Sequence, residues 1–256
     1  MERFHTLDSI LSWTVRIACT RLQAGLVDLL GDRLTWLAAY GSSTRPDGPK
    51  RPADLDTHAI LADEPSREIA ARILAAHDAI ALEVGIEWDS WYILEREARG
   101  SRPPRHLLHD GLVDGSWSLH RAHWLAGEYV LLHGPPVDTL VPAPAWSELN
   151  DGLRSELAAI VRGVGESTQD PRYLAYAVAN ACRIILSAET RNVVVSKRAA
   201  LMWAMRELPA RYGVAVHAAN RMLDGEPEEA DGERLFARAG DLVVLATHRL
   251  SCLVAK

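Results

Sequence analysis

This chain of 256 residues has few cysteines, and it lacks long apolar runs and an excess of positive charge. The three cysteines, Cys19, Cys182 and Cys252, lie far apart, so neither a disulfide framework nor a zinc spacing follows. No apolar run reaches about 18 residues, the length of a membrane-spanning helix. The first residues read as an amphipathic helix without the pattern of a signal peptide. We therefore expect a soluble cytoplasmic protein with no membrane partner.

The charge balance argues against a nucleic-acid partner. The chain carries 28 Lys and Arg against 34 Asp and Glu, which gives a formal net charge of −6 and a pI of about 5.9. A domain that binds duplex nucleic acid shows the opposite balance on one face. A small anionic substrate would still need local positive charge. We expect a monomer that acts on small molecules.

The first half of the chain predicts an α+β fold with a small mixed sheet. Apolar residues recur at helical spacing over 7–31 and 66–84. The intervening segments 33–41 and 54–62 read as two strands, antiparallel to one another, and 88–95 reads as a third. The order helix, strand, strand, helix, strand is typical of a helix-covered sheet.

A proline-rich segment, Gly134–Trp146, separates this part from a helical one. Beyond it, five stretches show helical periodicity, with Pro171 near the first turn of one and Ser196 as the N-cap of another. We therefore predict two domains, a sheet domain over 1–145 and a C-terminal α-helical bundle over 146–256.

Asp54 and Asp56 are the first candidates for chemistry. On a strand, residues two apart point to the same face, so both carboxylates project together. Like charges at this spacing need a cation, and Mg²⁺ prefers such hard oxygen ligands and bridges to phosphates. The preceding turn, Gly41–Ser43, offers backbone N–H groups and hydroxyls that can cradle a phosphate. This combination indicates phosphoryl or nucleotidyl transfer.

A third carboxylate would complete a two-metal cluster, and the third strand is where it is expected. Asp89 is the preferred candidate, Glu87 shares its face if the strand starts early, and Glu83 falls on the preceding helix. The choice stays open at this point. The segment His120–Trp124 holds two histidines without an acid at metal spacing, and we interpret it as half-buried helix rather than a zinc site.

A helix over residues 171–190 would align Tyr173, Tyr176, Asn180 and Arg183 along one face. This polar and aromatic face either lines a cleft for an acceptor or faces outward with two half-buried tyrosines. The acidic segment Asp224–Glu233 reads as a solvated loop without function.

The motifs together resemble a known family. Gly41-Ser42 followed by Asp54-x-Asp56 is similar to the signature of the DNA-polymerase-β-type nucleotidyltransferase superfamily. The stretch "CRIILSAETRNVVVSKRAALMWAMRELP" resembles the helical region of aminoglycoside adenylyltransferases that act on streptomycin and spectinomycin, and "LLHGPPVDTLVPAP" resembles their interdomain segment. The resemblance extends from about residue 34 to residue 225.

The resemblance implies ATP and Mg²⁺ as cofactors and transfer of AMP to a drug hydroxyl. It makes Asp54, Asp56 and Asp89 the metal ligands and Asp89 also the general base. It makes Gly41, Ser42, Arg183 and Lys197 the nucleotide-binding residues, with Tyr173 and Tyr176 facing the acceptor. The family's tyrosine near the base is replaced by Leu223, and its acceptor-binding tryptophan and acids do not match cleanly.

The resulting hypothesis is Mg²⁺-dependent transfer of AMP from ATP to a hydroxyl of an aminoglycoside-like small molecule, at an active site between the two domains. One alternative is the same transfer to another acceptor. The other is a non-enzymatic module that binds a nucleotide as a sensor or an antitoxin-like partner. A missing third carboxylate would favour that module.

Overall fold

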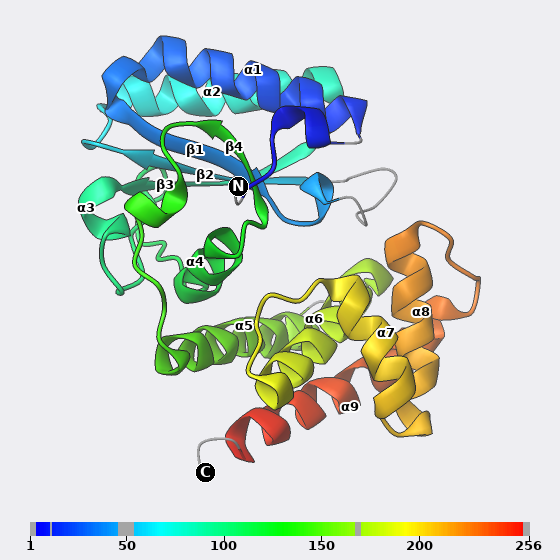
Figure 1. Ribbon diagram of the computed structural model, residues 1–256. Coiled ribbons are helices and arrows are strands. Elements are labelled where there is room, and N and C mark those ends of the chain that lie inside the picture. Colours follow the sequence, from blue (N-terminus) through cyan, green and yellow to red (C-terminus); the bar gives the residue numbers. More distant parts are fainter. Residues whose placement is uncertain (1–3, 11, 46–53, 167–169, 253–256) are drawn as a thin grey trace. The chain divides into compact units, whose positions relative to one another are not determined.

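The structure is a computed structural model that describes residues 4–10, 12–45, 54–166 and 170–252. It consists of two compact units, Met1–Pro144 and Ala145–Lys256, which are described one at a time. Most of the proline-rich connection expected between the first two strands lies outside the described residues. Figure 1 shows the elements of each unit.

The first unit is built on a four-stranded sheet with the order β3-β2-β1-β4. β1 pairs antiparallel with both β2 and β4, while β2 and β3 are parallel, so the sheet is mixed as predicted. Helix α2 provides the crossover that a parallel pair requires. The helices and strands of this unit are α1 (Trp13–Leu30), β1 (Leu34–Tyr40), β2 (Asp54–Leu61), α2 (Arg67–Val84), β3 (Glu87–Leu94), α3 (Glu95–Ala98), α4 (Trp117–Leu125) and β4 (Tyr129–His133).

The two faces of the sheet have different coverings, because side chains alternate along each strand. Helices α1 and α2 lie over one face, and α4 lies on the other (Figure 1). The face under α1 and α2 buries Leu37, Leu55 and Tyr92 with the apolar stripes of those helices. The opposite face buries Trp36 and Ile60 with the tryptophans of α4. The predicted carboxylates lie on this second face.

Local signals explain where the helices begin and end. The hydroxyl of Ser66 accepts a hydrogen bond from the backbone N–H of Ile69 and starts α2, and Gly85 ends it in the left-handed conformation, both as predicted. The first helix was predicted from residue 7, but α1 starts at Trp13. The side chain of Ser12 caps it there by accepting from a backbone N–H of the first turn, and only a short 3₁₀ turn precedes it.

The second unit is helical throughout its described elements. Its helices are α5 (Trp146–Glu166), α6 (Pro171–Thr190), α7 (Lys197–Glu207), α8 (Gly213–Asp224) and α9 (Asp231–Cys252). The predicted positions of Pro171 and Ser196 at helix starts are confirmed, and the Ser196 hydroxyl accepts from the N–H of Ala199. None of the helices in the described part of the chain combines the length and apolar character that crossing a membrane requires.

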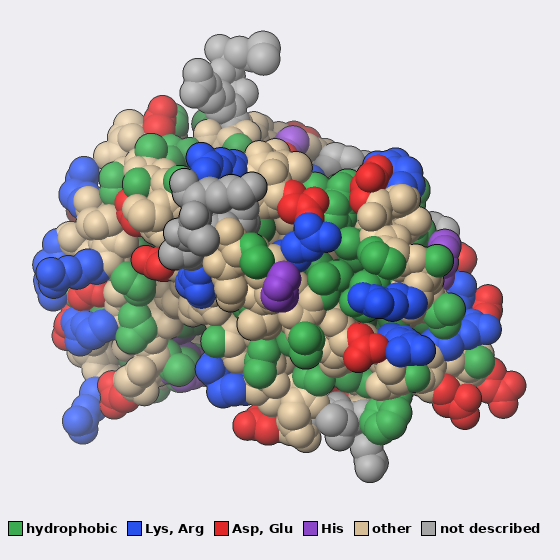
Figure 2. All heavy atoms as spheres, turned by 90° about the horizontal axis from the view of Figure 1, so that it is seen from below, with side chains coloured by type: hydrophobic (Ala, Val, Ile, Leu, Met, Phe, Trp, Pro, Cys, Tyr) green, Lys and Arg blue, Asp and Glu red, His purple; other side chains and the backbone are tan. Residues whose placement is uncertain are grey.

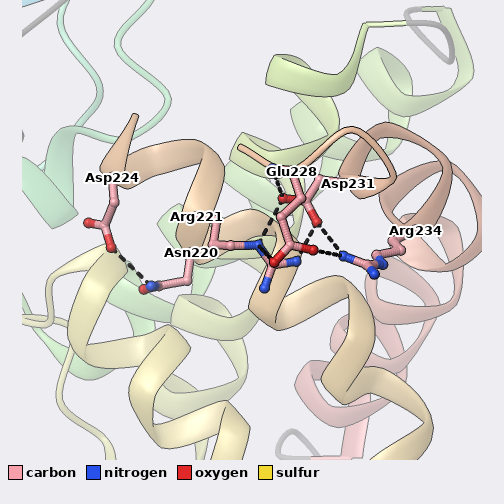
Figure 3. Close-up of polar contacts among 6 residues, drawn as sticks. All are labelled: Asn220, Arg221, Asp224, Glu228, Asp231 and Arg234. Atoms are coloured by element: carbon pink, nitrogen blue, oxygen red, sulfur yellow. Dashed lines mark hydrogen bonds and ion pairs between the residues drawn. The ribbon is translucent and has the colours of Figure 1, made fainter. Parts of the chain in front are cut away.

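The acidic segment between α8 and α9 was predicted to be a solvated loop, and for Asp231 this is wrong. The Asp231 side chain is fully buried and accepts hydrogen bonds from the guanidinium groups of Arg221 and Arg234 and from the backbone N–H of Glu228 (Figure 3). Glu228 also pairs with Arg234. The sequence shows only a run of acids, whereas the structure uses one of them to join two helices.

Charged side chains of both signs cover the face shown in Figure 2. Blue Lys and Arg side chains alternate there with red Asp and Glu side chains, with apolar side chains between them. Among the described residues on that face, the basic groups do not gather into one continuous patch.

Gly134 provides a test of backbone packing. It follows β4 at φ +94°, and an added Cβ would lie 2.3 Å from the carbonyl oxygen of Thr35 on β1. Gly85 also has a positive φ, +68°, but has open space around it. Both substitutions to alanine incur the left-handed backbone penalty of about 1 kcal/mol, and only Gly134→Ala adds a clash with the backbone, worth about 2 kcal/mol more. Thermal unfolding should show a lower Tm for Gly134→Ala than for Gly85→Ala, and equal Tm values would contradict this account.

Asp231 should make the stability of the protein depend on acid pH. The hydrogen bond from Arg221 holds the pKa of its carboxyl well below the usual range, against the effect of burial, with help from Glu228 N–H and Arg234. A depressed pKa stabilises the folded state above the unfolded-state pKa, and this contribution falls as the pH drops below about 4.

We therefore expect Asp231→Asn to lower the free energy of unfolding by about 2 kcal/mol at neutral pH, a value reduced because both guanidinium groups are partly exposed. Denaturant unfolding of both proteins between about pH 7 and pH 3 should show the difference narrowing on acidification. A difference that is independent of pH would rule out the ion pair as its source.

Candidate functional site

The strand register brings the predicted carboxylates to one edge of the sheet. Asp54 and Asp56 lie at the start of β2, and β3 runs parallel beside it with Asp56 opposite Asp89 and Asp54 opposite Glu87. All four acids therefore belong to the same face, the one not covered by α1 and α2. The register places both Asp89 and Glu87 beside the Asp-x-Asp pair. Each faces one member of the pair, and Asp89 lies deeper along the strand.

The glycine-serine turn lies directly against this pair. Tyr40, the last residue of β1, pairs with Asp56, and Gly41 follows it at φ +80°. A Cβ on Gly41 would lie 1.8 Å from Oδ2 of Asp56, so no other residue fits without moving that carboxylate. The Ser43 hydroxyl donates to the carbonyl oxygen of Asp54 at 2.5 Å and ties the turn to β2.

Two serines in this turn have different surroundings. Ser43 is buried and is used for the bond to the β2 backbone. The hydroxyl of Ser42, which is only half-buried, makes no hydrogen bond to any of the residues that the structure describes. Of the two serines, Ser42 is therefore the one whose hydroxyl has no partner among the described residues.

Asp89 has the more perturbed environment of the two candidate bases. The residue is exposed, but its carboxyl group is partly enclosed, and this desolvation together with the charges of Asp54 and Asp114 raises its pKa above the usual value, while His120 and His106 act in the opposite direction. A raised pKa is what a proton acceptor near neutral pH needs. Glu87 lies at the exposed start of β3, opposite Asp54.

A second polar cluster lies on the same face and was missed in the sequence. His58, two residues after Asp56 on β2, contacts Oδ2 of Asp114 through Nε2 at 3.3 Å, and Nδ1 of His120 on α4 contacts the same oxygen at 2.9 Å. Burial lowers the pKa of His58 to about 4. The rings of His58 and His120 both lie 5.3 Å from the ring of Tyr40. His58, Asp114 and His120 come from β2, from the loop before α4 and from α4, so only the folded chain brings them together.

Asp114 is the centre of this cluster, and it stays ionised despite its burial. Burial by itself would raise its pKa, but the charge and hydrogen bond of His120 and the hydrogen bond of His58 outweigh that effect and hold the pKa far below its usual range. Its other oxygen accepts from the backbone N–H of Ser116. The acid partner of His120, which the sequence did not reveal, is therefore supplied by the loop before α4.

Within the helical unit, the predicted nucleotide ligands have partners of their own. The Lys197 ammonium lies 4.4 Å from the centre of the Tyr176 ring, and Tyr176 is half exposed. Arg183 forms an ion pair of 2.7 Å with Glu156 on α5. Nothing in the sequence had pointed to Glu156. Lys197 and Tyr176 are thus brought together as two of the predicted site residues.

Tyr173 and Asn180, the other members of the predicted polar face, both make contacts inside the helical unit. Tyr173 packs against α5 so closely that a Cβ on Gly163 would lie 1.7 Å from its hydroxyl oxygen. Asn180 is fully buried and donates to the carbonyl oxygen of Tyr176, so its expected place on an accessible face is wrong. Tyr173 nevertheless keeps its ring 5.9 Å from that of Tyr176.

Residues 145–244 match the family model described as aminoglycoside adenylyltransferase, C-terminal domain. The crystal structure of spectinomycin adenyltransferase AAD(9) from Enterococcus faecialis with ATP and spectinomycin superposes with a TM-score of 0.75 at 16% sequence identity. The chain resembles the aminoglycoside nucleotidyltransferases. That superposition covers 92% of this chain and 98% of the AAD(9) chain. No curated protein matches the sequence.

These findings confirm the predicted resemblance and the predicted α+β fold with a helical C-terminal part. The family match covers the helical unit, which holds Arg183 and Lys197, and less than half of the chain. The structural match covers both units, but at 16% identity it speaks for the fold and not for individual residues. The assignment of roles to Asp54, Asp56 and Asp89 depends on the geometry described above.

Gly41 offers a direct test of the close approach between turn and carboxylate. In Gly41→Ala the methyl group must displace Asp56, and we expect affinity for Mg-ATP to fall by about 10-fold or more, equivalent to ~1.4 kcal/mol. Gly31→Ala is the matched control, because Gly31 also has a positive φ, +52°, but has nothing within 4 Å of its Cβ position. Isothermal titration calorimetry measures the affinity of both variants for Mg-ATP. Equal affinities would show that Asp56 does not take part in nucleotide binding.

Proposed function

We propose that this protein transfers AMP from ATP to a hydroxyl group of an aminoglycoside-like small molecule, with Mg²⁺ as cofactor. The strand register supports this proposal most strongly, because Asp56 and Asp89 are partners on adjacent parallel strands and Asp54 shares their face. The match of the helical unit to aminoglycoside adenylyltransferases gives the substrate class. The AAD(9) structure, which contains ATP and spectinomycin, has the same overall fold.

The residues present fit a magnesium site. Three carboxylates on one face supply the hard oxygen ligands that Mg²⁺ prefers, and without a cation they would repel one another. Gly41 lets the backbone come within contact of Asp56, as a site shared by a metal and a phosphate requires. When bound by Asp54, Asp56 and Asp89, Mg²⁺ would supply positive charge to the triphosphate.

In the proposed reaction, residues of the chain bind the nucleotide, orient the acceptor and remove a proton from the acceptor hydroxyl. The Ser42 hydroxyl and the Gly41 turn hold a phosphate, and Lys197 and Arg183 neutralise triphosphate charge. Asp89 accepts the proton as the acceptor's O–H bond breaks. The acceptor oxygen then bonds to the α-phosphorus while the bond from that phosphorus to pyrophosphate breaks. Tyr176, with Lys197 over its ring, and Tyr173 are proposed to face the acceptor.

The decisive experiment is incubation of the protein with Mg-ATP and a panel of aminoglycosides, followed by mass spectrometry of the drugs. We expect a mass increase of one AMP on at least one member of the panel, and none when Mg²⁺ is removed by a chelator. ATP binding without transfer to any acceptor would overturn the enzymatic proposal and favour a nucleotide-binding regulatory module.

The assignment of the base has its own matched pair of variants. Asp89→Asn should reduce the transfer rate by about 10²- to 10⁴-fold, the range of a lost general base, since the amide cannot accept the proton. Glu87→Gln changes the neighbouring acid on the same strand face and should leave most of the activity. Steady-state rates of pyrophosphate release measure both, and loss of activity in Glu87→Gln alone would move the role to Glu87.

A further inference from the structure

His58, Asp114 and His120 are grouped as metal ligands are, at a place that the proposed transfer reaction does not use. One donor atom from each residue, a ring nitrogen or a carboxylate oxygen, lies within 4.8 Å of the others. The three come from β2, from the loop before α4, and from α4 itself. His58 and Asp114 are essentially inaccessible to solvent, whereas the His120 side chain is 20% exposed.

Both histidine contacts end on one atom, Oδ2 of Asp114. The distance from His58 Nε2 is 3.3 Å, which is long for a hydrogen bond but close to the separation of about 3.3–3.4 Å between two ligands of a tetrahedral zinc ion. The distance from His120 Nδ1 is 2.9 Å, which is about half an ångström shorter than that separation. Metal binding therefore requires a shift of about half an ångström between the His120 ring and Asp114.

We propose that His58, Asp114 and His120 bind a divalent cation of the zinc class, at a site separate from the magnesium site of Asp54, Asp56 and Asp89. Two imidazoles and one carboxylate form a mixed nitrogen and oxygen donor set, which suits Zn²⁺ or Co²⁺ and not Mg²⁺. Three protein ligands leave one position open, and His120 is the ligand through which solvent reaches it.

Charge in this region favours a cation. Asp114 is a buried carboxylate, and the hydrogen bonds described for it come from the two histidines and from the backbone N–H of Ser116. Burial raises the pKa of the Tyr40 hydroxyl, and the nearby carboxylates of Asp56, Asp114 and Asp89 raise it further. A buried anion beside other anions is costly without a counter-charge. A protonated His120 supplies one in the metal-free protein, and a divalent cation supplies it when the His120 ring is neutral and acts as a ligand.

The surroundings also resemble the support that a metal site requires. The backbone N–H of Ser116 fixes the second oxygen of Asp114, and the His120 ring stacks on Trp124 with the ring planes 16° apart. Such contacts orient ligands before the ion arrives. A cation here would tie α4 to β2 two residues beyond Asp56, so that metal binding stiffens the strand that carries the proposed magnesium ligands. The proposal does not depend on the transferase activity.

The test uses the full chain, stripped of metal with a chelator and dialysed against Zn²⁺ in the presence of excess Mg²⁺ to saturate the three aspartates. We expect one zinc ion per chain by inductively coupled plasma mass spectrometry. His120→Ala and Asp114→Asn should weaken zinc binding by about 10-fold or more. Asp54→Asn should keep it, because that residue belongs to the magnesium site.

His248→Ala is the control for incidental binding, since His248 and Cys252 form an exposed pair at the end of α9. Zinc binding should survive this substitution. A zinc-free wild type, full binding by His120→Ala, or loss of binding in Asp54→Asn or His248→Ala would each overturn the proposal. In that case the three residues form a hydrogen-bonded network and nothing more.

A second measurement does not depend on variants that fold. Co²⁺ in a four-coordinate site with nitrogen ligands absorbs visible light strongly, whereas six-coordinate Co²⁺ held by oxygens absorbs weakly. Added to the wild-type protein, Co²⁺ should give strong bands that excess Mg²⁺ leaves unchanged and that Zn²⁺ removes. Weak bands, or bands that Mg²⁺ removes, would place the ion at the aspartates and contradict the proposal.

Discussion

Repulsion between carboxylates that share one face of the sheet is the constraint on which this structure depends. Asp54, Asp56 and Asp89 come from neighbouring strands in parallel register, and Asp114 lies close enough to raise the pKa of Asp89. Such a cluster opposes folding unless its charges are compensated. Two features limit this electrostatic repulsion. The acids of β2 and β3 lie at the solvent-accessible start of both strands, and Asp114, the one that is buried, has two histidines against it.

The rest of the sheet domain supplies the stability that this arrangement requires. Helices α1 and α2 bury the opposite face continuously, without an acid among the core residues there. On the carboxylate face, Trp36, Trp117 and Trp124 fill the space beyond the acids with large apolar area. His58 and His120 lie where the carboxylates of this face meet its tryptophans. Both rings contact Trp124, and both contact the carboxylate of Asp114.

Features that depend on neighbouring residues could be predicted from the sequence, and features that depend on distant ones could not. The strands β1 to β3 and the caps Ser66, Gly85 and Ser196 follow from local patterns, and the structure confirms them. Asp89 could not be distinguished from Glu87, because the register of β3 against β2 is a property of the folded sheet. The cluster of His58, Asp114 and His120 was missed for the same reason.

The acidic run before α9 shows a different limit. The acidic composition of this segment indicates a solvated loop, and most acidic runs of this kind are solvated. Asp231 departs from it because two arginines, one before and one after it in the chain, converge on its carboxylate (Figure 3). Nothing in the spacing of these residues distinguishes a buried ion pair from three exposed charges, so the sequence alone overestimated the exposure of Asp231.

The partners of the basic residues in the helical unit decide which of them a triphosphate can recruit. Arg221 and Arg234 are fixed by the buried carboxylate of Asp231, and drawing either away would leave that anion short of a counter-charge. Arg183 pairs with Glu156, and both side chains keep about a fifth of their surface exposed, whereas the Asp231 side chain is fully buried. Lys197 lies over the Tyr176 ring, 4.4 Å from its centre. Neither Arg183 nor Lys197 has a fully buried carboxylate as its described partner, and this distinguishes them from Arg221 and Arg234.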